Sequence, residues 1–188
     1  TKNRRGLSAR MKVCCGLAAL AAGKYKLAAR KFVTVEPELQ HAQTQPFPDW
    51  AKHVLAPRDI AAFGGLCAVA EFDRGELKRL VIDESCTFRH FLELHPAIRE
   101  LVGDFYSSRY PSCLRILSSL RAELVFDLYL SPHIDKLQSM IHSRALVQYF
   151  NPYTRLDLRI MAQAFSTSVP SMEQQVAELI ISGKIHAR

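Results

Sequence analysis

Apolar residues recur every three or four positions through residues 8–34, with a break at residues 23–25. This spacing predicts two helices joined by a tight turn. Gly16, Ala28 and Phe32 also stand at offsets of the tetratricopeptide (TPR) pattern, where small residues let paired helices approach closely. The segment is therefore expected to form a TPR-like helical hairpin.

Residues 36–56 are rich in proline and glutamine and show no helical period. We expect a surface loop here, pinned to the body by Trp50. The hairpin and this loop make up the first predicted unit, residues 1–56.

Residues 57–149 contain a series of further helical patterns. Pro57, Pro96 and Pro132 open three of them, since proline suits the first turn of a helix. Asp73 is placed to cap a short helix, and the pair Gly64-Gly65 lies inside a helical pattern, where the missing side chains permit close packing. The last three helices of the unit carry the apolar stripes Ile98, Leu101, Val102 and Phe105; Leu114, Leu117, Leu120, Leu124 and Leu128; and Ile134, Leu137, Ile141, Ala145 and Tyr149. Short connections between such helices predict the helical-repeat part of a curved α-solenoid.

Residues 150–188 have the pattern of a small separate unit. Asp157 can cap a short helix, residues 166–168 form a turn, and Pro170 starts a second helix with Met172, Val176, Leu179 and Ile180 directed inward. Residues 184–188 then alternate polar and apolar positions, as a strand does. This order is that of an incomplete winged helix. The predicted fold is therefore mainly α: a TPR-like α-solenoid of helical hairpins followed by a truncated winged-helix subdomain.

The net charge of +7 is concentrated at one end of the chain. Residues 1–31 carry nine Lys/Arg and no acid, whereas the remaining residues hold 16 bases and 18 acids. An acidic partner, a polyanion or RNA could bind this basic patch, but a solvated flank of a repeat is the interpretation we favour, because only Tyr25 is available to stack on bases. Besides Lys2, the basic patch consists of Arg4, Arg5, Arg10, Lys12, Lys24, Lys26, Arg30 and Lys31.

No arrangement of residues typical of an enzyme, a metal site or a cofactor site is found. The histidines lack metal-binding spacing and are expected to be satisfied or on the surface. The five cysteines (Cys14, Cys15, Cys67, Cys86, Cys113) lack the spacing of zinc ligands or of a disulfide framework, and we expect them to be buried. We therefore predict a protein that is not an enzyme and binds no cofactor, from a reducing compartment. The apolar runs are too short to span a membrane, and a chain that starts at Thr1 is expected to be a segment of a longer protein.

The second helix of the winged-helix-like unit is unsuited to DNA. Its only charged residues between Ser168 and Gly183 are Glu173 and Glu178, which would repel phosphates, so no DNA binding is expected. The strand that follows offers a backbone edge to which a strand of another chain can add. We therefore predict a partner contact at Lys184, Ile185, His186, Ala187 and Arg188. An uncovered edge could also lead to self-association of the fragment.

A helical solenoid that leads into a winged helix resembles the PCI domain, which subunits of the proteasome lid, the signalosome and a translation initiation factor share. Residues 87–94, 98–110, 156–158 and 161–165 look like the first-subunit family of the constitutive-photomorphogenesis signalosome, and residues 167–169 and 184–188 fit it too. The resemblance runs from about Met11 to the end of the chain.

This resemblance implies a non-catalytic scaffold in a complex that removes Nedd8 from cullin-RING ubiquitin ligases, in the nucleus and cytoplasm. Its partners would be other PCI subunits, reached through the winged helix, and cullin-RING ligase components, reached through the parent protein. Two alternatives stay open: a PCI scaffold of the proteasome-lid type, and a nucleic-acid adaptor that uses the basic N-terminal helices.

Overall fold

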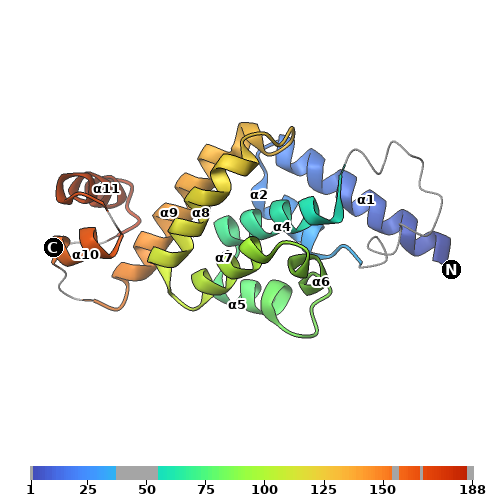
Figure 1. Cartoon of the computed structure of the whole chain (residues 1–188), viewed down its shortest axis with the longest axis horizontal. Coiled ribbons are helices and arrows are strands. Elements are labelled where there is room, and N and C mark those ends of the chain that lie inside the picture. The colour runs from blue at the N-terminus through green and yellow to red at the C-terminus, as the bar shows by residue number, and fades with distance from the viewer. Residues whose placement is uncertain (1, 37–54, 154–156, 166, 186–188) are drawn as a thin grey trace.

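The computed structural model describes residues 2–36, 55–153, 157–165 and 167–185, with residues 2–6 as backbone only. Figure 1 shows an elongated molecule with its termini at opposite ends. The helices follow one another along its length, and no strand occurs within these ranges. The predicted mainly helical fold is confirmed, while the boundaries of the three predicted units stay predictions.

The predicted N-terminal hairpin is confirmed as α1 (Lys2–Ala21) and α2 (Tyr25–Val33). Gly23, with φ of +68°, makes the turn between them. Gly16 faces Phe32 so closely that an added Cβ would lie 2.8 Å from Cε1 of that ring. The small residue is thus what lets the two helices approach, as the TPR-like pattern predicts. The expected loop with Trp50 lies mostly outside the described residues.

Helix α4 (Pro57–Glu71) is the centre of the body, and 11 of its 15 residues are buried. It packs on α2 and on α6 (Arg89–Glu93), α7 (Pro96–Tyr106) and α9 (Ile134–Phe150). An added Cβ on Gly65 would overlap Cγ2 of Ile98, so the Gly64-Gly65 pair permits this packing as predicted. Between α4 and α6, Asp73 caps α5 (Arg74–Leu77) by accepting from Glu76 N at 2.7 Å, and a π-helical turn follows at Lys78–Ile82.

Helices α8 (Tyr110–Leu124) and α9 form the next hairpin, with a short 3-10 turn (Ser131–His133) before α9. The stripe predicted through Leu128 is wrong at that residue. The helix ends at Leu124, and the Leu128 side chain is 82% exposed, because the chain turns at Asp127.

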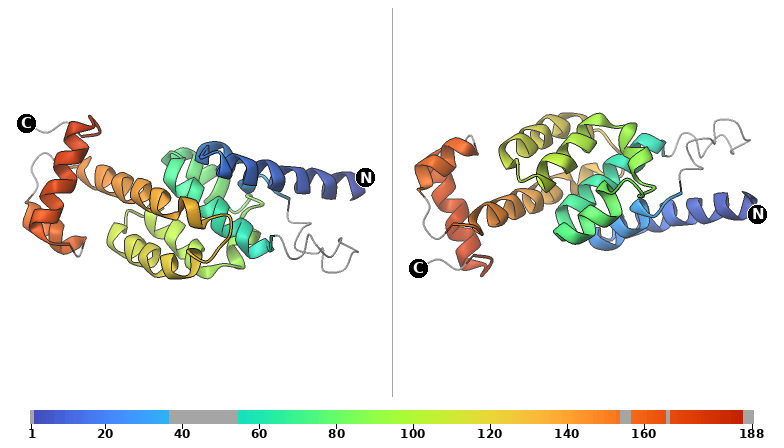
Figure 2. Two further views of the ribbon diagram at one scale, coloured as in Figure 1. Left: turned by 90° about the horizontal axis from the view of Figure 1, so that it is seen from above. Right: turned by 90° about the horizontal axis from the view of Figure 1, so that it is seen from below.

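The last two helices are α10 (Leu158–Ala164) and α11 (Val169–Ile181). Figure 2 shows α11 running across the end of α9. Met172 and Leu179 are buried as predicted, but Ile180 is 39% exposed. The inward direction expected for Ile180 is therefore wrong, since it lies one residue beyond the buried Leu179 on the helix surface.

Candidate protein-docking surface

The C-terminal helix pair is held in shape by side-chain caps. Asp157 Oδ1 accepts from the backbone N–H of Arg159 at 2.8 Å, at the start of α10. Ser168 Oγ accepts from Ser171 N at 3.4 Å, at the start of α11. Met161 of α10 and Met172 of α11 are both fully buried. The pair is therefore a preformed unit that can present its outer surface to a partner.

The outer face of α11 carries acidic and polar residues over most of its length, and the exposed Ile180 and Ile181 lie at its end. Glu173, Gln174 and Glu178 are exposed, and the helix holds no Lys or Arg. Such a face opposes a phosphate backbone. The charges of this helix therefore favour contact with protein over contact with nucleic acid.

The strand expected over residues 184–188 is not formed at its first two residues. Gly183 adopts φ of +68°, and the N–H groups of Lys184 and Ile185 both donate to the carbonyl of Leu179, at 2.9 and 3.3 Å. These bonds close the C-terminus of α11 and take the two donors that a strand would use. The expectation of a strand is therefore wrong at Lys184 and Ile185. Residues 186–188 lie outside the described part, and the partner contact predicted for Lys184, Ile185, His186, Ala187 and Arg188 stays a prediction.

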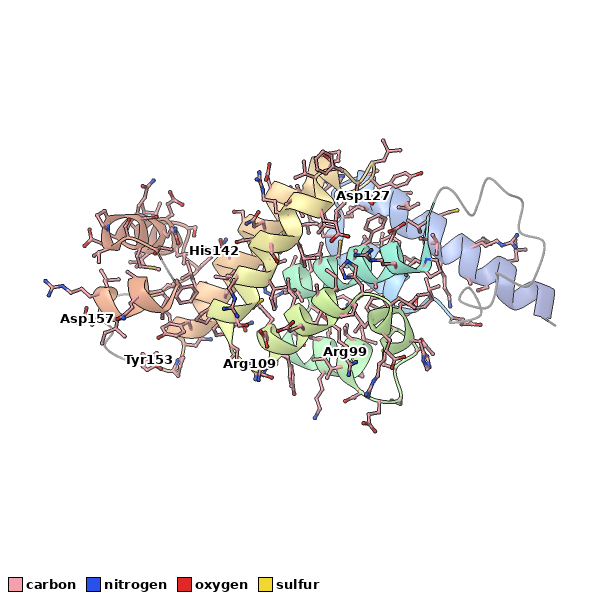
Figure 3. All side chains as sticks on the ribbon, in the orientation of Figure 1. Arg99, Arg109, Asp127, His142, Tyr153 and Asp157 are labelled. Atoms are coloured by element: carbon pink, nitrogen blue, oxygen red, sulfur yellow. The ribbon has the colours of Figure 1, made fainter. Side chains whose placement is uncertain are left out.

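An aromatic cluster joins the helix pair to the body. The Phe165 ring meets the ring of Tyr149 edge to face, with centroids 5.2 Å apart, and that of His142 at 6.4 Å. Tyr149 in turn contacts Tyr110, whose hydroxyl donates to Gln148 at 3.0 Å. Figure 3 shows His142 on the side of α9 that faces the helix pair. Phe165 is only 7% exposed, so one buried ring ties the pair to α9.

A groove of about 630 Å³ lies between α9 and α11. Leu146 and Leu179 lie in its lining, and His142 borders it; burial lowers the pKa of that histidine, so its neutral form is favoured. The other lining residues are mostly polar. Because the groove opens beside Lys184, it belongs to the same surface as the predicted contact.

The structure divides the predicted basic patch. Arg30 and Lys26 both bind the carboxylate of Glu76, at 2.7 and 3.3 Å, and these contacts lower the pKa of Glu76 to about 2. Lys12 donates to the Thr34 carbonyl at 2.8 Å. Three of the bases are thus engaged within the fold, which reduces the charge available to a polyanion.

The other residues of the basic patch whose side chains are described differ in exposure. Lys24 and Arg10 are exposed, and Lys31 is half-buried. Arg4 and Arg5 lie in α1, but their side chains are outside the described part.

The burial of the cysteines and the hydrogen bonding of the histidines agree only in part with the predictions. Cys14 and Cys15 are exposed, so their predicted burial is wrong; they lie on the outer side of α1, which nothing in the described residues covers. Cys67 and Cys113 are buried, and burial raises the pKa of each thiol to about 12. His95 is 3% exposed, and its Nδ1 has no hydrogen-bond partner among the described residues. Within the described residues no three His, Cys, Asp or Glu side chains are grouped to hold a metal ion, and no helix is long and apolar enough to cross a membrane.

Comparison with known proteins identifies the architecture. The PCI domain family matches residues 90–188, which is more than half of the chain, and the family described as 26S proteasome subunit RPN7 matches residues 3–80. The chain belongs to the PCI domain family. The PCI match covers α7 to α11 and therefore includes the helix pair, the aromatic cluster and the groove.

Individual relatives divide into two groups. Over 97% of its length the chain is 49% identical to COP9 signalosome complex subunit 1 of Arabidopsis thaliana, and over 95% it is 44% identical to COP9 signalosome complex subunit 1b of Drosophila melanogaster. It covers 39% and 32% of the length of those proteins. Identity to 26S proteasome non-ATPase regulatory subunit 6 of Oryza sativa is 25% over 95% of the chain. The PCI chain is thus more similar to the signalosome proteins than to this proteasome protein.

Sequence reasoning missed the aromatic cluster and the groove. His142 and Tyr149 are seven residues apart in a helical pattern, a spacing that puts them on one face, and this signal was available. Their shared neighbour Phe165 comes from another helix. No pattern within α9 could reveal it.

Proposed function

We propose that this PCI chain is a non-catalytic part of a signalosome scaffold subunit. In this role it supports assembly of the complex that removes Nedd8 from cullin-RING ubiquitin ligases. The observation that carries the proposal is the 49% and 44% identity to two signalosome subunits, across nearly the whole chain. Its companions would be other PCI subunits, with ligase components reached through the full-length protein, in the nucleus and cytoplasm.

The C-terminal helix pair is the proposed docking unit. Its caps fix the starts of both helices, its α11 face carries two glutamates, and the groove beside Lys184 adds a polar recess. A rigid surface loses little conformational entropy when a partner binds. These features suit a subunit that assembles with proteins.

A scaffold of the proteasome-lid type is the second candidate, because the RPN7 family matches residues 3–80. The two candidates predict different companions. The full-length protein should be purified under native conditions and its stoichiometric companions identified by mass spectrometry. Recovery of signalosome subunits together with cullin-deneddylating activity supports the proposal. Recovery of proteasome subunits supports the second candidate. If neither group of subunits is recovered, both candidates are contradicted.

The nucleic-acid alternative has its own test. Binding to a duplex and to a single strand is measured at about 50 and 200 mM salt, because phosphate contacts weaken steeply over this range. We expect weak, salt-sensitive binding, since Lys12, Lys26 and Arg30 are already engaged. Tight binding that survives the higher salt would favour the adaptor instead.

Replacement of Ile185 by proline tests the docking unit. Proline removes the N–H of residue 185, which donates to the Leu179 carbonyl at the end of α11, and fixes the backbone at the predicted contact, so assembly of the full-length protein with its companions should weaken. Leu94→Ser is the control, because Leu94 is 44% exposed and lies outside the helix pair. Equal assembly of the two variants, with folding verified by circular dichroism, argues against a contact at residues 184–188.

A further inference from the structure

Ser108 has a backbone conformation that its residue type disfavours. It lies just beyond the C-terminus of α7, and apart from glycines it is the only described residue with a positive φ, at +60°. A side chain at such a left-handed position costs free energy that glycine avoids, so glycine is the usual residue after a helix. Backbone strain of this kind persists mainly where it serves a function. The hydroxyl group of Ser108 is the feature that glycine would lack.

The Ser108 hydroxyl is held from two neighbouring helices. Its Oγ accepts from Nη1 of Arg74, on α5, at 3.2 Å and lies 3.3 Å from the hydroxyl oxygen of Tyr110, on α8. Nη2 of Arg74 donates to the Tyr106 carbonyl at 2.6 Å, and the guanidinium lies 4.9 Å from the centre of the Tyr106 ring. Figure 3 marks the turn by its label on Arg109, the next residue. One guanidinium is therefore fixed in place and directed at the hydroxyl.

No carboxylate balances the charge of Arg74. Its two hydrogen bonds go to neutral acceptors, and within the described residues it forms no ion pair. The neighbouring acid Asp73 directs its carboxylate to Glu76 N instead, as the cap of α5. Arg109 differs from Arg74, because its Nε and Nη2 both donate to Oδ1 of the buried Asp104, at 2.8 and 2.6 Å. Since a guanidinium has five N–H donors, Arg74 keeps capacity for an anion at this turn.

A phosphate group on Ser108 is the anion that this geometry suits. The side chain is exposed, so an enzyme can reach it, and the Arg74 donor already points at the oxygen that would carry the phosphate. The C-terminus of α7 is the negative end of its dipole and by itself disfavours a phosphate. A guanidinium beside the same oxygen reverses this preference, because its planar fork pairs with two phosphate oxygens in charge-assisted bonds. The effect of a phosphate here therefore depends on Arg74.

We propose that Ser108 is a phosphorylation site whose phosphate Arg74 binds. On a protein kinase, Oγ attacks the γ-phosphorus of ATP, the bond to the β-phosphate breaks, ADP leaves, and the hydroxyl proton passes to a base of the kinase. The phosphoserine carries a charge of about −1.5 to −2. Its pair with Arg74 replaces a single neutral contact and fastens α5 to the turn between α7 and α8. This inference does not depend on which complex the chain belongs to.

Site-specific incorporation of phosphoserine at position 108 of the full-length protein tests the geometry. Hydrogen exchange of a peptide that covers residues 104–112 reports opening of the turn, where the N–H groups of Ser108 and Arg109 donate to α7 carbonyls at 3.2 and 2.8 Å. We expect exchange to be about tenfold slower with phosphoserine than with serine. Equal exchange of the two proteins overturns the proposal.

The role of Arg74 is tested in the same assay. With Arg74→Gln, phosphoserine should leave exchange unchanged or make it faster, because the phosphate then meets only the negative end of α7. Arg99→Gln is the matched control, since Arg99 is an exposed arginine of α7, and it should preserve the slowing. A slowing that survives Arg74→Gln overturns the assignment of Arg74.

The modification itself is measured on full-length protein isolated, with phosphatase inhibitors, from the cells that produce it. Mass spectrometry of the peptide that contains Ser107 and Ser108 locates any phosphate. Phosphate on Ser108 supports the proposal. Phosphate on Ser107 alone, or on neither serine, overturns it.

Discussion

Replacement of Arg144 by methionine tests how the hairpin α8–α9 is fastened to the central helix. The Arg144 guanidinium donates from Nη1 to the Val69 carbonyl at 2.6 Å and from Nη2 to the Phe72 carbonyl. These carbonyls belong to the C-terminal end of α4, where backbone acceptors lack helical partners and the helix dipole is negative. The guanidinium also lies 5.6 Å from the centre of the Phe105 ring.

The expected loss can be worked from these contacts. A hydrogen bond to a charged group contributes about 1.5–3 kcal/mol, and the dipole and the ring add about 1 kcal/mol together. Arg144 is half-buried, so its charged group is partly desolvated and its pKa is lowered, and methionine removes this unfavourable contribution. We therefore expect Arg144→Met to destabilise the fold by about 2–4 kcal/mol.

Urea unfolding followed by circular dichroism measures this loss. The midpoint should fall while the slope stays unchanged, and the melting temperature should fall by about 5–15 °C. Arg99→Met is the control, since Arg99 is an exposed residue of α7 and its loss should change stability by about 0.5 kcal/mol or less. A loss at Arg144 no larger than that of the control would refute the proposed role of the two carbonyl contacts.

Two further predictions concern packing and charge. Gly65→Ala should lower the melting temperature strongly, because its Cβ would overlap Ile98. Gly103→Ala should instead raise stability by about 0.5–1 kcal/mol, because no neighbouring element comes within 4 Å of the added Cβ. Equal effects of the two variants in thermal unfolding would contradict this account. Glu76→Gln should destabilise the chain at neutral pH, because Arg30 and Lys26 lower the pKa of that carboxyl to about 2. A carboxylate with a lowered pKa stabilises the folded protein at pH values above its unfolded-state pKa, and this stabilisation is lost as the pH falls. The difference in stability from the unchanged protein should therefore disappear between about pH 4.5 and 2. A difference that persists at pH 2 would show another cause.

Local patterns predicted most of the helices correctly. Asp73 and Asp157 cap the helices that they were expected to cap, because capping depends on a side chain and a backbone N–H only two or three residues apart. Gly16 and the Gly64-Gly65 pair marked close helix approaches, because glycine within a helical pattern is unfavourable unless packing requires it.

Predictions of exposure failed where they depended on other elements. Leu128 and Ile180 matched apolar stripes but are exposed, and Cys14 was expected inside but lies on the outer side of α1. Burial depends on what covers a position, which the spacing along one helix does not specify.

By itself the sequence determined the helical composition, the hairpin turns, the caps and the position of the positive charge. The tertiary structure decided which bases Glu76 neutralises, which ring holds the C-terminal helix pair to α9, and which apolar turn faces solvent. The physical reason is distance along the chain. Helix periodicity and capping arise between residues up to four positions apart, whereas the pair Arg30 and Glu76 or the pair Tyr149 and Phe165 meets only after the helices have packed.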